Sequence, residues 1–428
     1  MKILIISIET WRDDTNGGNV LSNLFENFDA DFAQIYCSSG LPENKICRNY
    51  YQMTDAMALQ NILKKKKMGR IVTMKEYIDP LTTDMNIRKI KNKGNFEILR
   101  IMRQIVWGLS DYKNKELIQF ILEFNPDVIF APCYGATYML SLTRFVAEIT
   151  KKPIISYISD DFYSLRQFKI SPIYWFNKFV VRSQVRKTWK YYSLIYTMTD
   201  NQKNLMSKLG KPIKILRKSG NFENYNYQKN IVSPIKIIYA GGIYLNRWKT
   251  LVYIAKAIKE INKENKKFIL DIYTNNTIDK KIYKILNDNE NCFFHKAIPF
   301  DQLKIEYQKS DIALHVESFD IKNRLNVRMS FSTKIIDCLD SGCAVMAVSD
   351  KKQGGFVYLK NEDAAICIDT PKKIKSTLET ILDKPSIINV YRKKALECGK
   401  KNHRKENNDK ELKQDFERIA DKNGCFTD

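Results

Sequence analysis

The stretch that decides the fold is residues 311–350, which read DIALHVESFDIKNRLNVRMSFSTKIIDCLDSGCAVMAVSD. It passes from a short apolar strand through a long polar loop into a helical pattern near Thr333, and then into a second apolar strand. Gly342 follows the helical part, as glycine often does where a chain leaves a helix. A strand, a helix and a second strand in this order form the repeating unit of a parallel sheet with crossover helices.

The same alternation continues in both directions along the chain, with short apolar runs separated by stretches of helical period. In the first half we predict strands at 2–8, 32–37, 127–132, 153–159, 193–199 and 213–217. Between them, helical patterns occupy 97–109, 115–124, 137–150 and 200–209. In the second half we predict strands at 235–239, 268–273, 292–295, 312–316, 344–348 and 364–368. The fold class is therefore α/β, built from doubly wound sheets.

The length of 428 residues is too great for one ordinary core, so we expect two domains. A polar, asparagine-rich stretch without helical period separates the two halves. We predict a Rossmann-like domain at 1–220, a linker at 221–234, a second Rossmann-like domain at 235–395 and a charged helical tail at 396–428. Because such sheets bind ligands at the carboxyl ends of their strands, two domains facing each other would build one central cleft.

Composition narrows the class of protein. The net charge of +23 favours anionic partners, although a lysine-rich surface also serves solubility. We find no arginine-rich groove with interleaved aromatic residues, so we expect no nucleic-acid partner. The nine cysteines form no CxxC pair and only three histidines are present, which argues against a zinc site and favours a reducing cytoplasm. The first residues lack the features of a signal peptide, and no apolar run approaches the ~20 residues that span a bilayer.

The helix predicted near Thr333 carries the most informative candidate site. Ser330 or Ser332 is placed to cap it, and its start would present the amides of Ser332, Thr333 and Lys334 together with a hydroxyl and an ammonium group. Such a helix start suits a diphosphate. Asp337, one turn further, is placed to accept hydrogen bonds from a ribose diol. An ordinary capped helix with a surface aspartate fits the same pattern.

This segment resembles the donor-binding signature of family 4-type retaining glycosyltransferases, which have the GT-B fold. In that family two glutamates flank seven residues, and the second glutamate holds the ribose. Asp337 takes the position of the second glutamate, whereas Met329 falls on the first. The resemblance then leaves Glu317, or His315 beside it, to reach the sugar. The sequence Ser-Thr-Lys before the helix is similar to the branch that acts in surface-polysaccharide biosynthesis.

Two further matches follow the order of the family's motifs. The loop that starts at Gly241-Gly242 is similar to the first loop of the family's C-terminal domain, where a cation neutralises the donor phosphates. Arg247 fits that position, and Lys249 is the reserve candidate. Gly17-Gly18 follows the first strand, where family members carry a glycine pair that lets the backbone approach the donor. A glycine pair alone is more often a simple turn.

The resemblance implies an N-terminal acceptor domain, a C-terminal donor domain and a tail that packs back on the first domain. It implies transfer of a sugar from a nucleotide sugar, which we expect to be UDP-linked, to a saccharide or lipid-linked saccharide. Retention of anomeric configuration, with cationic side chains in place of a metal, is part of the same implication. Two alternatives stay open: a nucleotide-sugar epimerase of the same fold, and a non-catalytic partner subunit, which Met329 motivates.

Two features of the first half complete the candidates. Asp160-Asp161 follows a predicted strand, and one of the two would act as base on the acceptor hydroxyl or cap the next helix. Residues 168–192 mix aromatic and basic side chains, which suits a helix on an anionic membrane surface. Lys64–Lys67 would add to this patch. A core helix with a solvated basic face fits residues 168–192 equally well.

Overall fold

The computed structural model describes all of the chain except residues 14–15, 73–95, 223–228 and 422–428. The chain forms two compact units. The first unit comprises Met1–Leu165, Lys169–Leu216 and Glu406–Asp428, and the second comprises Arg166–Phe168 and Arg217–Lys405. The second unit thus starts and ends outside the range of 235–395 predicted for the donor domain, and part of the predicted linker lies outside the described residues.

An eight-stranded sheet forms the centre of the first unit, in the order β4-β3-β2-β1-β5-β6-β7-β8. All neighbouring strands are parallel except β3 and β4, which are antiparallel. The strands are β1 (Lys2–Ser7), β2 (Asp31–Tyr36), β3 (Asn49–Gln52), β4 (Arg70–Val72), β5 (Val128–Phe130), β6 (Ile154–Ile158), β7 (Tyr192–Thr197) and β8 (Ile213–Ile215). The order reverses between β1 and β5, as in a doubly wound Rossmann-like sheet.

Amphipathic helices cover this sheet. They are α1 (Asn16–Phe25), α2 (Asp55–Lys64), α3 (Phe96–Leu109), α4 (Lys115–Phe124), α5 (Thr137–Thr150), α6 (Pro172–Trp189), α7 (Asp200–Met206) and, at the end of the chain, α16 (Lys405–Asp421). Side chains cap several helix starts, as Asn114 does for α4 by accepting a hydrogen bond from the Leu117 amide at 2.9 Å. Helix α16 belongs to the first unit because Phe416 packs edge-on against Phe25 and Asp415 accepts a hydrogen bond from Tyr196 at 2.7 Å.

The second unit contains a six-stranded parallel sheet in the order β11-β10-β9-β12-β13-β14. Its strands are β9 (Ile235–Ala240), β10 (Phe268–Tyr273), β11 (Cys292–His295), β12 (Ile312–Val316), β13 (Ala344–Val348) and β14 (Ile366–Ile368). This is the Rossmann-type order, with the reversal between β9 and β12. The predicted strands of this half are confirmed, since strongly apolar runs of this length leave little choice of conformation.

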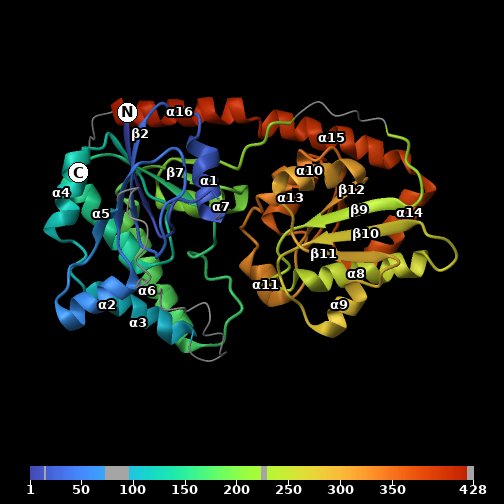
Figure 1. The fold of residues 1–428 in the computed structure, drawn as a ribbon, viewed down its shortest axis with the longest axis horizontal. Helices are drawn as coiled ribbons and strands as arrows, with labels where there is room; N and C mark the ends of the chain where they lie inside the picture. The colour runs from blue at the N-terminus through green and yellow to red at the C-terminus, as the bar shows by residue number, and fades with distance from the viewer. Residues whose placement is uncertain (14–15, 73–95, 223–228, 422–428) are drawn as a thin grey trace. The chain divides into compact units, whose positions relative to one another are not determined.

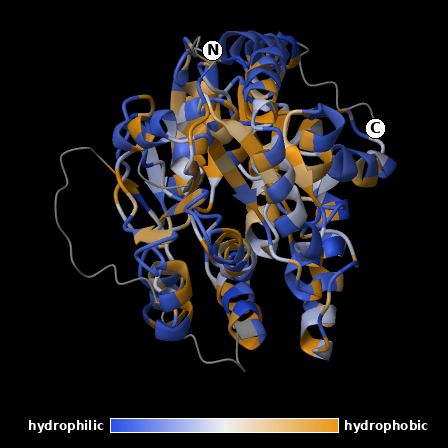
Figure 2. Ribbon diagram, turned by 90° about the vertical axis from the view of Figure 1, so that its right-hand side faces the viewer, coloured by the Kyte–Doolittle hydropathy of each residue, from blue (hydrophilic) through white to orange (hydrophobic). Residues whose placement is uncertain are grey.

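The helices of the second unit lie on both faces of its sheet. They are α8 (Arg247–Ile261), α9 (Lys280–Leu286), α10 (Phe300–Lys309), α11 (Ile321–Asn326), α12 (Lys334–Leu339), α13 (Gly354–Asn361), α14 (Ile374–Asp383) and α15 (Ser386–Asn402). Figure 1 shows α8 and α9 below β9, β10 and β11, with α10, α13 and α15 above them. In Figure 2 the hydrophobic colour concentrates on the strands, while the helices carry hydrophilic outer sides. Two buried apolar clusters, one in each unit, match this arrangement.

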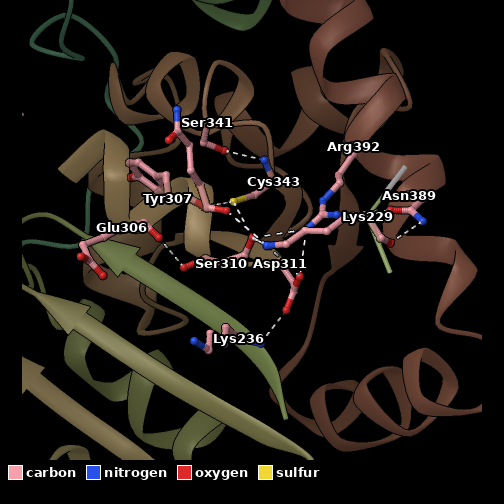
Figure 3. Close-up of polar contacts among 11 residues, drawn as sticks. Lys229, Lys236, Glu306, Tyr307, Ser310, Asp311, Ser341, Cys343, Asn389 and Arg392 are labelled. Atoms are coloured by element: carbon pink, nitrogen blue, oxygen red, sulfur yellow. Dashed lines mark hydrogen bonds and ion pairs between the residues drawn. The ribbon is translucent and has the colours of Figure 1, made fainter. Parts of the chain in front are cut away.

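A buried ion network fastens α15 to the amino-terminal edge of the second sheet (Figure 3). Asp311, just before β12, accepts a hydrogen bond from Arg392 of α15 at 2.9 Å and another from the Lys236 amide at 2.9 Å. Lys229 adds a second cation at 3.7 Å from the same carboxylate. Both Arg392 and Asp311 are buried, so the pair is shielded from water and its geometry matters for stability.

Several elements differ from the sequence prediction. The polar loop after β12 contains the short helix α11, which its polar composition hid. Strands β3 and β4 and helix α2 were not predicted, because Asn49, Gln52 and Arg70 interrupt the apolar signal in the two short strands. The charged helical stretch before the C-terminus divides into α15 and α16, with His403 at the break.

Candidate functional site

The candidate site lies at the carboxyl edge of the second sheet, where the strand order reverses. Strands β9 and β12 are neighbours there, and their following loops leave in opposite directions around the sheet. Open parallel sheets bind ligands at this kind of point. The loop after β9 leads through Gly241 into α8, and β12 is followed directly by Glu317.

Arg247 and Glu317 form a buried, two-pronged ion pair at this edge. Nε of Arg247 donates to Glu317 Oε2 at 2.8 Å, and Nη2 donates to Oε1 at 2.7 Å. Thr250, one turn into α8, donates its hydroxyl to the main-chain oxygen of Glu317 at 2.7 Å. Burial opposes the charge of Arg247, but the hydrogen bonds and charge of Glu317 outweigh it and raise the pKa of the guanidinium. The arginine is thus permanently charged and held in one orientation.

Lys334, the first residue of α12, places a second cation beside this pair. Its Nζ is buried and, within the described part of the chain, has no hydrogen-bond partner. Burial and the neighbouring Arg247 charge lower the pKa of the Lys334 ammonium to about 8. Gly241 makes the position possible: its φ is +142°, and a Cβ there would lie 1.8 Å from Lys334 Nζ. A buried cation without a partner is costly, so this arrangement invites an anion.

His315 and Tyr239 lie on the neighbouring strands β12 and β9, close to Lys334. His315 lies on β12 and is buried, and burial lowers the pKa of its imidazole to about 4, so it is neutral at physiological pH. In the described residues its Nε2 has no hydrogen-bond partner. Tyr239 of β9 donates its hydroxyl to the Gly242 carbonyl at 2.7 Å, and Lys334 Nζ lies 5.5 Å from the centre of its ring. The tyrosine therefore fixes the glycine loop and supports the lysine.

The start of α12 differs in detail from the prediction. The N-cap is Thr333, which has helical dihedral angles and makes no side-chain cap, so the predicted capping by Ser330 or Ser332 is wrong. The amides of Ser332, Thr333 and Lys334 still stand at the start of the helix. As at any helix start, the first amides have no acceptor within the helix. Asp337 lies in the same helix and pairs with Lys218 at 2.9 Å.

The remaining predicted residues of this unit have ordinary partners. Lys249, the reserve cation, pairs with Asp320 at 3.0 Å, and Asn246 donates to the same carboxylate at 2.6 Å. Met329 is buried, as an apolar side chain in that position should be. Sequence reasoning did not single out Tyr239 or Lys218 for a role: Tyr239 belongs to the segment that matches the family's glycine loop but was interpreted as a strand residue, and Lys218 stands in no motif.

Four predicted residues belong to the first unit. Gly17 and Gly18 fall in the first turn of α1, and a Cβ on Gly18 would lie 1.9 Å from the main-chain oxygen of Arg12. Asp161 accepts a hydrogen bond from the Ser164 amide at 2.8 Å and so closes a turn. The next helix, α6, begins later and is capped by another residue, so the prediction that Asp160 or Asp161 caps it is wrong.

No cluster of three or more metal-ligating side chains occurs among the described residues. The eight described cysteines are all free. None of the described helices is both long and apolar enough to cross a bilayer.

Comparison with known proteins gives a match in structure but not in sequence. No protein-family model matches the chain, and no curated protein sequence matches it. HepE of Anabaena, solved in complex with UDP, superposes with a TM-score of 0.62 at 10% identity, covering 98% of this chain and 100% of that one. Sucrose-phosphate synthase from Thermosynechococcus elongatus gives 0.61 at 11% identity, covering 98% of each chain. An α,α-trehalose-phosphate synthase (UDP-forming) from Burkholderia xenovorans gives 0.58 at 10% identity, covering 98% and 100%.

The fold is that of the GT-B glycosyltransferases. The predicted fold class, with two Rossmann-like doubly wound domains, is therefore confirmed. Identity near 10% shows the fold alone and assigns no individual residue of this chain.

Proposed function

We propose that this protein is a glycosyltransferase that uses a nucleotide-diphosphate sugar as donor. The observation that carries the proposal is the pair of cations at the strand-order reversal of the second sheet: Arg247, held by Glu317, and Lys334, whose buried Nζ has no hydrogen-bond partner in the described residues. A diphosphate would supply the missing negative charge. The UDP complex of HepE, which has the same fold, supports UDP as the nucleotide.

In this proposal each residue of the site has one task. Lys334 and the amides at 332–334 bind the diphosphate, and Arg247 supplies a fixed positive charge beside it. Asp337 holds the ribose diol, which requires it to share or release Lys218. Glu317 acts through Arg247 by fixing the direction of the guanidinium, since both of its carboxylate oxygens accept hydrogen bonds from that residue.

The reaction breaks the bond between the sugar's anomeric carbon and the diphosphate oxygen, and the nucleotide leaves with the electron pair. The acceptor hydroxyl forms the new bond and gives up its proton. Charge grows on the departing diphosphate, and preorganised cations at that place lower the barrier. Positive charge from Arg247 and Lys334 would serve the purpose that a divalent cation serves elsewhere, so we propose metal-independent transfer. Retention of configuration is part of the proposal only through the resemblance to the retaining family 4-type enzymes.

The acceptor belongs to the same proposal. We infer a saccharide or a lipid-linked saccharide of cell-surface polysaccharide biosynthesis, from the likeness of the Ser-Thr-Lys segment to that branch of the family. Asp160 and Asp161, on the loop after β6 of the first unit, are the carboxylates we propose near the acceptor hydroxyl, and Gly17 and Gly18 would allow a close approach of the donor.

A panel of nucleotides and nucleotide sugars tests the proposal. Thermal melting should show stabilisation by UDP and by one or more UDP-sugars, because a ligand that binds only the folded state raises the melting temperature. Arg247→Ala should remove this shift, whereas Lys256→Ala, on the exposed side of the same helix, should keep it. Because Arg247→Ala leaves Glu317 buried without its partner, the double variant Arg247→Ala/Glu317→Ala checks that loss of binding is not loss of folding.

Transfer itself is measured with the stabilising sugar nucleotide and a set of saccharide acceptors, with and without EDTA. Product formation that EDTA leaves unchanged supports the full proposal. Stabilisation by no nucleotide at all would contradict it. Binding without transfer would support a non-catalytic partner subunit, and release of an epimerised or free sugar without an acceptor would support an epimerase.

A further inference from the structure

An apolar face with a basic surround lies on the first unit, away from its sheet. On α3 the side chains of Ile98, Met102, Ile105 and Leu109 follow one helical stripe and are 43%, 54%, 54% and 70% exposed. Helix α6 adds Ile173, Phe176 and Phe179, which are 41%, 66% and 56% exposed. We call these seven residues the α3–α6 face. Apolar side chains gathered in this way are rare on a free surface and mark an interaction site.

The two helices present this face as one surface. They pack against each other, and Gln104 of α3 donates a hydrogen bond to Asn177 of α6 at 3.1 Å. Between them lies an open hollow of about 420 Å³, lined by Ile98, Ile101, Met102, Pro172, Ile173 and Phe176. The lining is entirely apolar. The hollow therefore suits a hydrocarbon chain or side chain and offers no polar group to a soluble metabolite.

Charge on the α6 side of the face has a single sign, and the acidic residues Glu97 and Asp111 stand at the two ends of α3. Between residues 162 and 199 the sequence contains no aspartate or glutamate. The same stretch contains seven basic residues: Arg166, Lys169, Lys178, Arg182, Arg186, Lys187 and Lys190. Lys169, Arg186, Lys187 and Lys190 are exposed. A helix with exposed aromatic and aliphatic side chains and a predominantly basic polar side is typical of proteins that lie on anionic membranes.

We propose that the α3–α6 face docks on an anionic lipid bilayer, with Phe176, Phe179 and Met102 entering the boundary between head groups and acyl chains. A second copy of the chain is a poorer occupant. A two-fold symmetric contact would place the basic surround of one copy against that of the other, which like charges oppose. The proposal does not depend on the site in the second unit. UDP binding and membrane binding are therefore tested independently of each other.

Vesicle sedimentation with the full chain tests the proposal. The protein should sediment with vesicles of phosphatidylcholine containing about one third phosphatidylglycerol, should bind phosphatidylcholine alone at least about tenfold more weakly, and should dissociate as salt is raised. Phe176→Ser/Phe179→Ser should weaken binding at least about tenfold. The control Leu122→Ser/Ile305→Ser changes two exposed apolar residues that belong to neither α3 nor α6 and should bind as the wild type does.

A charge-reversal pair separates specific docking from the effect of net charge. Lys187→Glu/Lys190→Glu should weaken binding to the anionic vesicles at least about tenfold. The control Lys256→Glu/Lys259→Glu makes the same charge change on α8 of the second unit and should keep most of the vesicle binding. Equal losses in both pairs would overturn the proposal. So would absence of sedimentation by a wild type that still binds UDP, or light scattering that shows a dimer dispersed by Phe176→Ser/Phe179→Ser without any vesicle binding.

Discussion

The two edges of the second sheet both hold buried charges, but they hold them differently. At the amino edge, Asp311 faces Arg392 at 2.9 Å and Lys229 at 3.7 Å, so the buried carboxylate is compensated within the chain (Figure 3). At the carboxyl edge, Arg247 has its carboxylate, but Lys334 Nζ lies buried beside it with no hydrogen-bond partner among the described residues.

The buried charges at the amino edge stabilise the fold, whereas those at the carboxyl edge are suited to binding an anion. In the network around Asp311 the buried carboxylate already has its cations, so breaking that network mainly destabilises the fold. A buried cation without a hydrogen-bond partner costs free energy in the free protein, and part of that cost is recovered when an anion binds. Stability should therefore respond with opposite signs at the two edges, and UDP affinity should respond only at the carboxyl edge.

The largest effect is expected at the amino edge. Arg392→Ala removes the closest charged partner of a buried carboxylate and should lower the free energy of unfolding by about 3–5 kcal/mol, measured by urea denaturation. UDP affinity of the folded variant should stay at the wild-type level. The matched control is Lys375→Ala, which breaks an exposed pair with Glu260 and should cost about 0–1 kcal/mol. Equal losses in the two variants would remove the structural distinction between these charges.

At the carboxyl edge, Lys334→Met should act in the opposite direction. Loss of a charge-assisted contact of about 1.5–3 kcal/mol should weaken UDP binding roughly 10- to 150-fold, measured by calorimetry. The melting temperature of the free protein should rise, because the variant no longer buries an ammonium group that lacks a hydrogen-bond partner in the described residues. Lys256→Met serves as the exposed control. A variant that binds UDP normally would show that the nucleotide lies elsewhere.

Glu317→Gln sharpens the comparison further. The amide keeps the shape of the side chain and can accept one hydrogen bond from Arg247, but the negative charge is gone. We expect the free energy of unfolding to fall by about 1–3 kcal/mol. UDP binding should strengthen by a few-fold, because the repulsion between the Glu317 carboxylate and the diphosphate is removed, and one such charge interaction is modest in size. Glu379→Gln on the exposed side of α14 is the control, and weaker UDP binding in Glu317→Gln would contradict the assignment of Glu317 as a positioning residue.

The smallest effect is a pH dependence. The pKa of Lys334 is lowered to about 8, below its value in the unfolded chain, so UDP affinity should fall as pH rises through about 8. For the free protein the sign is reversed. The folded state loses this proton more readily than the unfolded state, so the contribution of Lys334 to stability increases as pH rises from about 8 toward the unfolded pKa. Titrations of Lys334→Met should lack both trends, and their persistence would assign them to another group.

The strands show how much of the secondary structure can be predicted from the local sequence pattern. Runs such as 268–273 and 344–348 are so apolar that periodicity alone located them to within a residue or two. Short strands with polar residues, such as β3 (Asn49–Gln52), gave no such signal, because their conformation depends on pairing with β2. The helix start at Ser332–Lys334 was located from sequence, but its capping was not, since the cap depends on how the preceding loop packs.

The sequence by itself determined the α/β class, the two-part organisation and the candidates Arg247, Glu317, Lys334 and Asp337, because each depends on local period or on a short motif. Only the tertiary structure decided how these groups meet. Pairing of β9 with β12 brings Glu317 onto Arg247, and the missing Cβ of Gly241 makes room for Lys334 Nζ. Such contacts join residues far apart in the chain, 70 positions for Arg247 and Glu317 and 119 positions for Lys218 and Asp337. Their energies depend on burial, which no local pattern records.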